Sequence, residues 1–366
     1  MRVSLAAAGT AGHIEPALAL ARWLRSVEPA IECEFLGSSA ALDSSLMQSS
    51  GFELRPVIKA PFPRKFSVSL LTWPFKFIRS LLQLSKYLSG TDLVVGFGGY
   101  VCAPTYVVAR MKRIPIIIHE ANVKPGMANN LGRILGAHLT IAFESTRTVD
   151  HDWSSATLVG MPVRSEFKEF AGLSAKARNE HRSAKAAEWN FDEKRPIVLV
   201  FGGSQGSRAI NSVISSIVTE TERAGIQIVH AVGSSNALPA RSKNYLPLHY
   251  ISDMAEAMVA ADLAITRGGA VTCAELGILH TFGVIVPLAI GNGEQSFNAR
   301  ELEQIGGAVT IPEREFSARK LSENFFGYIK AAQEYRARAI SPAFTITAEE
   351  NLGSVVLATL RGGVRG

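Results

Sequence analysis

The chain has 366 residues, of which 47% are hydrophobic and 19% charged, and its formal net charge at pH 7 is +6. This length and composition exclude an intrinsically disordered chain and leave room for two ordinary domains. The modest basic excess fits an anionic substrate, nucleic acid or anionic lipid, and does not choose among them. The three cysteines, Cys33, Cys102 and Cys273, are widely spaced. They indicate neither a disulfide framework nor a zinc site, as expected in a reducing compartment.

Apolar runs alternate with helical patterns along the chain. Short runs rich in Val and Ile, separated by helices, are typical of parallel strands buried on both faces. The runs expected to form a first sheet span 3–8, 31–36, 93–95, 114–118, 139–142 and 156–159. Those expected to form a second sheet span 197–201, 226–231, 246–250, 263–266 and 284–287. The sequence therefore predicts an α/β fold with two parallel sheets.

Two sheets imply two domains. The patterns break at 160–162, which reads GMP, and a polar, Lys- and Glu-rich stretch follows up to about Arg195. We place the first domain at residues 1–163 and the second at 164–346. We expect the last segment, 347–366, to form a helix that packs back on the first domain.

The N-terminal sequence does not resemble an export signal. The first apolar run is short and enters a glycine turn at once. No run reaches the roughly 18 to 20 uninterrupted apolar residues of a membrane-spanning helix. We therefore expect a cytoplasmic protein.

Two glycine-rich turns each lie between an apolar run and a helical pattern. One is in 198–211, VLVFGGSQGSRAIN, and the other in 2–13, RVSLAAAGTAGH. Backbone N–H groups of such a turn converge on an anion at the start of the helix. A tight strand-to-helix connection explains either turn alone at least as well. Together they point to a bound phosphate group.

Three familiar kinds of site do not fit. Residues 9–12, GTAG, lack the GxGxxG spacing, and 36–39, LGSS, carry no acid for a dinucleotide ribose, which disfavours a Rossmann dehydrogenase. Neither turn ends in Gly-Lys-Ser/Thr, which disfavours a P-loop NTPase. No HxxxH or CxxC pair suggests a transition metal. A nucleotide diphosphate, held between two domains by backbone amides and helix N-termini, remains.

Motifs along nearly the whole chain, read in order, resemble the MurG family. They are GTAGHIEPALALA (9–21), GFGGYVCAP (96–104), HEANVKPGMANN (119–130), GMPVR (160–164), FGGSQGSRAIN (201–211), RGGAVTCAEL (267–276) and GNGEQSFNA (291–299). The resemblance implies a GT-B fold, with two Rossmann-like parallel-sheet domains separated by a deep cleft. It also implies an inverting mechanism with no metal in the active site and no cofactor.

That family is a peripheral membrane glycosyltransferase. It moves N-acetylglucosamine from UDP-N-acetylglucosamine (UDP-GlcNAc) to the 4-hydroxyl of N-acetylmuramic acid in lipid I, an undecaprenyl-linked acceptor, and makes lipid II for peptidoglycan. The resemblance implies a first domain that meets acceptor and membrane, and a second that binds UDP-GlcNAc. It also implies a place at the cytoplasmic face of the plasma membrane, with cell-wall or division proteins as further partners.

Inversion requires a base that removes the proton of the acceptor hydroxyl, and His13 is the candidate. It lies at a helix start after the first glycine turn, where open α/β sheets place ligands. The positive helix end favours a neutral imidazole, which suits a base. A structural histidine that contacts the acceptor without moving a proton is an equally strong interpretation.

The resemblance implies a donor site made mostly by the second domain. Ser204 and neighbouring amides hold the diphosphate, Arg164 adds positive charge, and Glu275 accepts both ribose hydroxyls. Gln295, with Asn122 of the first domain, binds the sugar, and Ile251 meets the uracil. The other residues implied for UDP-GlcNAc are Thr10, Ala11, Gly12, Ala270, Val271 and Thr272.

Ordinary structural roles compete with these assignments. Glu275 also fits a first-turn helix position favoured by the helix dipole. Ile251 also fits the core. Asn122 and Gln295 also fit loop caps, an interpretation that is weaker for Gln295.

The segment 62–88, FPRKFSVSLLTWPFKFIRSLLQLSKYL, is amphipathic. Its apolar residues include Trp73, Phe75, Phe77, Leu81 and Leu84, and its basic residues are Arg64, Lys65, Lys76, Arg79 and Lys86. Aromatic and aliphatic anchors beside basic residues fit an anionic inner leaflet. A core helix with solvated lysines explains the pattern almost as well. The resemblance favours the membrane.

Two other classes of function stay open. A UDP-GlcNAc 2-epimerase shares the architecture and the donor, but needs further acid–base residues and no lipid-facing patch. A non-catalytic scaffold that binds the nucleotide sugar is the second, although the set of His13, Ser204, Glu275 and Gln295 argues for catalysis. Nucleic-acid binding is disfavoured, because the basic residues are dispersed and no recognised module is present.

Overall fold

A computed structural model describes residues 1–39, 47, 48, 50–60, 69–288, 293–338 and 344–362. The chain divides into two compact units. The first is Met1–Arg164 with Thr347–Gly366, and the second is Ser165–Ile346. This division lies one residue after the boundary expected from the sequence.

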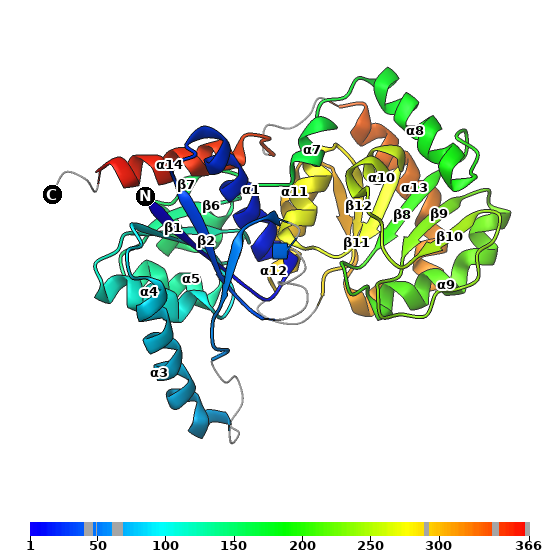
Figure 1. Ribbon diagram of the computed structural model, residues 1–366. Helices are drawn as coiled ribbons and strands as arrows, with labels where there is room; N and C mark the ends of the chain where they lie inside the picture. Colours follow the sequence, from blue (N-terminus) through cyan, green and yellow to red (C-terminus); the bar gives the residue numbers. More distant parts are fainter. Residues whose placement is uncertain (40–46, 49, 61–68, 289–292, 339–343, 363–366) are drawn as a thin grey trace. The chain divides into compact units, whose positions relative to one another are not determined.

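The first unit is built on a seven-stranded sheet in which all paired strands are parallel (Figure 1). The strand order is β3-β2-β1-β4-β5-β6-β7. The strands are β1 (Arg2–Ala7), β2 (Glu32–Gly37), β3 (Glu53–Pro56), β4 (Leu93–Gly98), β5 (Ile116–Glu120), β6 (His138–Ile141) and β7 (Thr157–Leu158). Every strand expected here overlaps an observed one. The short edge strand β3 was not expected, because only its half-exposed residues ELRP mark it.

Helices cover both faces of this sheet. They are α1 (Ala11–Val27), α3 (Ser69–Tyr87), α4 (Cys102–Met111), α5 (Met127–Ile134), α6 (Thr146–Val149), the 3₁₀ turn η1 (His151–Trp153) and α14 (Ala348–Gly362). Because successive strand residues point to opposite faces, β1 contributes side chains to two hydrophobic cores. Val3 and Leu5 face the core that includes Leu352 and Val356 of α14, whereas Ala6 faces the core of α3 and α4.

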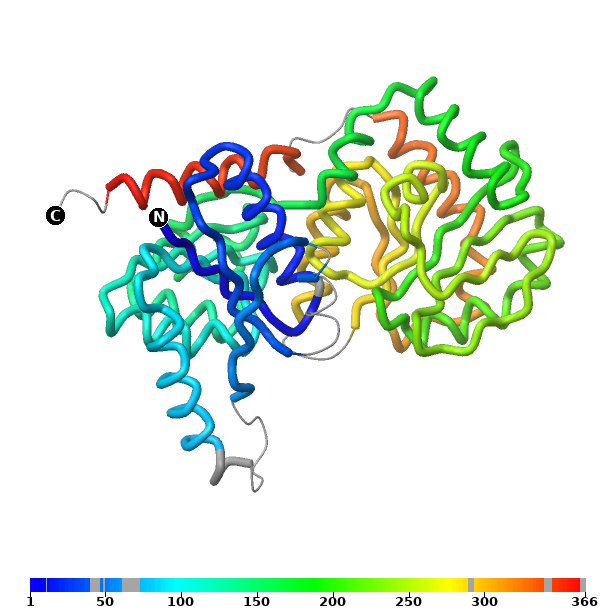
Figure 2. Tube along the Cα trace, viewed as in Figure 1, coloured from blue at the N-terminus to red at the C-terminus, as the bar shows by residue number. Residues whose placement is uncertain are grey.

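The C-terminal helix α14 belongs to the first unit and packs on α1 (Figures 1 and 2). The two helices approach closely at Gly353, where an added Cβ would lie 2.1 Å from the Trp23 ring. Asn351 donates from its side-chain amide to the carbonyl of Val159, at 3.1 Å. The end of the chain thus completes the core of the first unit.

The second unit contains a six-stranded sheet, also parallel, in the order β10-β9-β8-β11-β12-β13. Its strands are β8 (Ile197–Phe201), β9 (Gln227–Ala231), β10 (Tyr245–Leu248), β11 (Leu263–Thr266), β12 (Phe282–Ile285) and β13 (Ala308–Thr310). The strands expected from the sequence are again present. The edge strand β13 was missed, since three half-buried residues give no clear pattern.

The helices of the second unit are α7 (Ser165–Glu169), α8 (Ala175–Trp189), α9 (Arg208–Arg223), α10 (Met254–Ala260), α11 (Ala270–Ile278), α12 (Glu294–Gln304), the 3₁₀ turn η2 (Glu313–Glu315) and α13 (Ala318–Arg336). Serine hydroxyls accept backbone N–H groups at the start of α8, α9 and α13, a normal way to satisfy helix N-termini.

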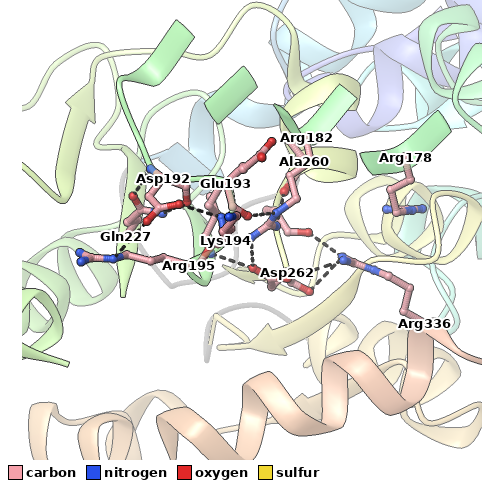
Figure 3. Close-up of polar contacts among 12 residues, drawn as sticks. Arg178, Arg182, Asp192, Glu193, Lys194, Arg195, Gln227, Ala260, Asp262 and Arg336 are labelled. Atoms are coloured by element: carbon pink, nitrogen blue, oxygen red, sulfur yellow. Dashed lines mark hydrogen bonds and ion pairs between the residues drawn. The ribbon is translucent and has the colours of Figure 1, made fainter. Parts of the chain in front are cut away.

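Three arginines hold the amino-terminal edge of the second sheet (Figure 3). They donate to successive carbonyls at the end of α10: Arg178 to Val259 (3.2 Å), Arg182 to Ala260 (2.8 Å) and Arg336 to Ala261 (2.6 Å). These carbonyls have no partner within the helix, and cations are favourable there. Asp262 pairs with Arg182 at 2.9 Å and accepts from the N–H of Ile197, at 2.7 Å. These contacts give this edge a structural role.

Candidate active site

The first glycine turn carries the chain from β1 into α1. Gly9 has a φ of +99°, which glycine adopts readily. The backbone of Thr10 is extended at the N-cap of α1, and its carbonyl accepts the N–H groups of His13 (3.1 Å) and Ile14 (3.3 Å). The predicted residues Thr10, Ala11 and Gly12 therefore form the start of α1, where backbone N–H groups face outward.

His13 is the third residue of α1, and its imidazole is half-buried. Nδ1 lies 3.1 Å from the carbonyl oxygen of Ala8 and 3.3 Å from the hydroxyl of Thr10. A carbonyl can only accept, so the hydrogen-bond network assigns the proton of the neutral ring to Nδ1. Nε2 then carries the lone pair. It faces Gly98, where an added Cβ would lie 2.9 Å away.

The turn after β4 is packed closely around this histidine. Gly98 and Gly99 have φ values of +109° and +86°, and a Cβ on Gly99 would lie 2.3 Å from the carbonyl oxygen of Ala8. Burial raises the pKa of the Cys102 thiol to about 11. The thiol is thus protonated at neutral pH and donates to the carbonyls of Gly98 (3.1 Å) and Ala6 (3.2 Å). Cys102 has a structural role.

Glu120, at the end of β5, is a buried residue that accepts several hydrogen bonds, a role that the sequence did not predict. One carboxylate oxygen accepts the backbone N–H and the side-chain amide of Asn122, at 2.9 and 3.2 Å. The other accepts the N–H of Gly126 and the amide of Asn129, both at 2.9 Å. Tyr106 donates to the side-chain oxygen of Asn129, also at 2.9 Å. The predicted sugar ligand Asn122 is therefore held by a buried carboxylate.

In the second unit, the turn after β8 is a narrow backbone loop. A Cβ on Gly202 would lie 2.4 Å from the backbone nitrogen of Ser207, and one on Gly206 would lie 1.9 Å from the carbonyl oxygen of Val232. Asn236 supports the turn, because its amide donates to Gln205 (3.0 Å) and Val232 (2.7 Å). The half-buried Ser204 thus lies on a constrained turn that leads into the 16-residue helix α9.

Helix α11 follows β11 and carries four of the predicted residues. Ala270, Val271 and Thr272 form its first turn. Glu275 is buried, with 6% of its surface exposed. The interpretation of Glu275 as a first-turn residue is wrong, because α11 begins at Ala270 and puts Glu275 in the second turn.

Gln295 is the second residue of α12 and lies next to the start of α11. A Cβ on Gly268 would lie 2.4 Å from the carbonyl oxygen of Gln295, so only glycine permits this approach. The side-chain oxygen of Gln295 accepts the N–H of Leu288, at 2.9 Å. Its NH₂ group is therefore the half that is suited to donate to a ligand. The preceding motif residues Gly291 and Asn292 lie outside the described residues.

The predicted donor residues of the second unit gather at one edge of its sheet. Ser204, Ala270 and Gln295 follow the neighbouring strands β8, β11 and β12. Ile251, 7% exposed, follows β10. Ligands of open α/β sheets bind at the carboxyl ends of strands. In the first unit, His13 and Asn122 follow β1 and β5, and Arg164 is the last residue before the division.

The exposed face of α3 differs in part from expectation. Leu84 is fully buried and contributes to the core, so it is not a membrane anchor. Phe75, Ile78 and Leu82 form an exposed stripe, with 72%, 54% and 63% of their surface exposed. Trp73 stacks on Phe77, with ring centroids 5.0 Å apart. Residues 62–68, which include Arg64 and Lys65, lie outside the described residues.

Two features of the described residues bear on metals and membranes. No group of three or more His, Cys, Asp or Glu side chains in the described ranges could hold a metal ion. Within the same ranges, no helix is long and apolar enough to cross a bilayer.

Comparisons with known proteins identify the family of this chain. The glycosyltransferase family 28 N-terminal domain matches residues 3–134, and the family 28 C-terminal domain matches 197–345. The UDP-N-acetylglucosamine–N-acetylmuramyl-(pentapeptide) pyrophosphoryl-undecaprenol N-acetylglucosamine transferase of Corynebacterium diphtheriae is 36% identical over 98% of this chain and 97% of its own length. The Corynebacterium glutamicum protein of that name is 41% identical over 88% of this chain and 87% of its own length. The chain belongs to the MurG family.

Solved structures add the fold. The MurG crystal structure from Acinetobacter baumannii has a TM-score of 0.72 and 26% identity, covering 98% of this chain and 99% of that one. A UDP-GlcNAc 2-epimerase from Neisseria meningitidis has a TM-score of 0.67, but only 12% identity over 98% and 100% of the two chains. The epimerase likeness shows the fold alone. The chain is thus a MurG-family glycosyltransferase with a GT-B fold of two parallel-sheet α/β domains.

Proposed function

We propose that this chain transfers N-acetylglucosamine from UDP-GlcNAc to the 4-hydroxyl of N-acetylmuramic acid in lipid I, with inversion, and so forms lipid II. The observation that carries this proposal is its near full-length similarity to transferases of that name. We assign the acceptor to the first unit and the donor to the second. The chemistry then requires a base for the acceptor and stabilisation of the departing UDP.

His13 is the proposed base. Its Nδ1–H is engaged by the Ala8 carbonyl, at 3.1 Å, which leaves Nε2 to accept a proton. As the acceptor oxygen forms its bond to the anomeric carbon, its proton moves to Nε2. The bond from that carbon to the diphosphate oxygen breaks on the opposite side, and the electron pair leaves with UDP. The Ala8 carbonyl orients the imidazole, as carboxylates do in other histidine bases.

The leaving diphosphate needs positive partners. We assign it to the amides around Ser204 and the N-terminus of α9, with the Arg164 guanidinium adding charge. Aligned amides at a helix start stabilise a phosphate group without a metal. This assignment is supported by the close packing at Gly202 and Gly206, two positions of the turn at which no side chain covers the backbone.

The rest of UDP-GlcNAc is assigned by chemistry. The Glu275 carboxylate accepts two ribose hydroxyls, and the first turn of α11 lies beside it. Gln295 donates from its NH₂ group to the sugar, and Asn122, held by Glu120, contributes a second amide. The buried Ile251 contacts the uracil. Thr10, Ala11 and Gly12 contribute the N-terminus of α1.

We further propose that the first unit meets the cytoplasmic face of the plasma membrane through the exposed stripe of α3. Phe75, Ile78 and Leu82 supply apolar contact, and the exposed Lys76 and Arg79 supply positive charge. Figure 2 shows α3 projecting from the body of its unit. Because lipid II feeds peptidoglycan synthesis, we also propose roles in cell shape and division, with cell-wall or division proteins as partners.

The test is a transfer assay with radiolabelled UDP-GlcNAc and a lipid I analogue. We expect label in the lipid only when the acceptor is present, and a large loss in Glu275→Ala together with weaker UDP binding. UDP binding without transfer by the wild type would contradict the proposal. UDP-GlcNAc consumption without acceptor would instead support epimerase chemistry.

A further inference from the structure

Arg267 occupies a central position at the carboxyl edge of the second sheet. It directly follows β11, which pairs with β8 on one side and β12 on the other. Gly268 and Gly269 then lead into α11. The side chain of Arg267 is only 13% exposed. A half-buried guanidinium among three loops at this edge requires an explanation beyond its own loop.

The guanidinium contacts the neighbouring loops on both sides. Nη2 donates to the hydroxyl of Ser207 at 2.7 Å. Nη1 donates to the carbonyl of Val286 at 3.0 Å and lies 2.5 Å from a carboxylate oxygen of Glu313. One planar group therefore connects the loop after β8, the loop after β12 and the 3₁₀ turn η2.

Each contact lies at a point that sets the shape of a loop. Ser207 is the N-cap of α9, is 5% exposed and accepts the N–H of Ile210 at 3.4 Å. Its backbone nitrogen packs against Gly202, so moving Ser207 moves the whole turn around Ser204. Val286 is the first residue after β12, and the chain from it leads to Gln295.

We propose that Arg267 is a positioning residue for the nucleotide sugar. Its hydrogen bonds fix the distances between the turn after β8, the start of α11 and the residues that follow β12. At these distances the three segments can bind the diphosphate, the ribose and the sugar of one ligand. The proposal rests on the donor site assigned above. Arginine suits this role because its rigid fork donates in fixed directions, whereas a lysine ammonium is a compact point charge on a flexible stem.

A purely stabilising arginine is the competing explanation, and Arg182 provides the matched control (Figure 3). Its side chain is 14% exposed, pairs with Asp262 and donates to three carbonyls, those of Glu193 at 2.9 Å, Ala260 at 2.8 Å and Arg195 at 2.7 Å. These contacts lie at the amino ends of β8 and β11, the opposite edge of the same sheet. Arg182 thus resembles Arg267 in burial and in contacting both a carboxylate and backbone carbonyls, but not in location.

The experiment compares wild type, Arg267→Lys and Arg182→Lys by calorimetric UDP binding, thermal unfolding and steady-state kinetics. We expect both variants to lower Tm. Only Arg267→Lys should raise the UDP Kd and the donor KM, by about tenfold, since charged hydrogen bonds to two loops are lost. The acceptor KM should stay within about twofold of wild type, because no acceptor contact changes.

An unchanged UDP Kd in Arg267→Lys would overturn the proposal, as would an equal loss of affinity in Arg182→Lys. Glu313→Gln, which keeps the hydrogen bonds to Ser207 and Val286, should raise the Kd less than Arg267→Lys. A wild type that binds UDP but transfers no sugar would reject the transferase function, while the binding series would still test Arg267.

Discussion

His13 shows how one hydrogen bond can set the chemistry of a side chain. The Ala8 carbonyl, 3.1 Å from Nδ1, fixes the tautomer and turns Nε2 toward Gly98. A capping histidine would need no particular orientation of Nε2. A base and a structural histidine both fit this geometry, and they differ in what a substitution should do.

Replacing His13 by Gln separates these two roles. A lost base should lower kcat by about 100-fold or more while the Kd for UDP stays at its wild-type value. A structural histidine would instead show a lowered Tm and a kcat within a few-fold of wild type. Steady-state kinetics, UDP calorimetry and thermal unfolding of the same preparation distinguish the two outcomes.

Two buried histidines predict how stability depends on pH. Burial lowers the pKa of His119 to about 3 and that of His230 to about 4, from an ordinary value of 6.5. Both are neutral in the folded chain, whereas the unfolded chain protonates them near pH 6.5. The free energy of unfolding should therefore be undiminished above about pH 6.5 and fall below it, by about 1.4 kcal/mol per pH unit for each histidine.

Urea unfolding between pH 7 and pH 5 measures this slope. His230 is bonded to Tyr245 (2.9 Å) and Asn211 (3.1 Å), and Gln offers a donor and an acceptor in its place. His230→Gln should remove the contribution of one histidine and flatten the profile. A variant profile parallel to that of wild type would show that His230 does not titrate in this way.

At the scale of elements, α14 is fixed by its contact with α1. Gly353→Ala would bring a methyl group to 2.1 Å from the Trp23 ring. We expect a loss of about 1–3 kcal/mol in the free energy of unfolding, despite the better helix propensity of Ala. Gly362→Ala, at the end of the same helix with nothing within 4 Å, is the matched control and should cost nothing. Equal stability of the two variants would mean that α14 does not pack as described.

The proposed membrane role of α3 predicts an effect of charge. Reversing both Lys76 and Arg79 to Glu should weaken binding to vesicles rich in anionic lipid by at least about tenfold, since each basic residue near such a surface contributes about 1 kcal/mol. The Kd for UDP should not change. Reversing Arg319 and Lys330, exposed on α13 of the second unit, alters net charge equally. The same loss in that control would remove α3 from the membrane model.

For the whole molecule, the sequence predicted the two parallel sheets, because buried strands and glycine turns leave local patterns. The residues proposed for the donor came instead from the resemblance to the MurG family. The sequence did not predict the half-exposed edge strands β3 and β13. The sequence analysis also misassigned Leu84, because the rotation of a helix about its axis decides which of its apolar residues face the core and which face water. Glu120 and Arg267 were not singled out, because their roles depend on partners from other loops.

In both units a glycine turn follows the first strand of a parallel sheet. The later strands of each sheet lie on both sides of that first strand, in order of increasing distance from it. In the proposed function, the turn of the second unit holds the diphosphate, and the turn of the first unit precedes His13. The proposed mechanism then depends on backbone amides for the leaving group and on His13 for the proton.

The most direct test of this account is the structure of the product. Purified chain would be incubated with UDP-GlcNAc and a lipid I analogue, and the isolated lipid examined by NMR. We predict one N-acetylglucosamine on the 4-hydroxyl of N-acetylmuramic acid, in the β configuration, with one UDP released per linkage. UDP release without a new linkage, or retention of the α configuration, would contradict it.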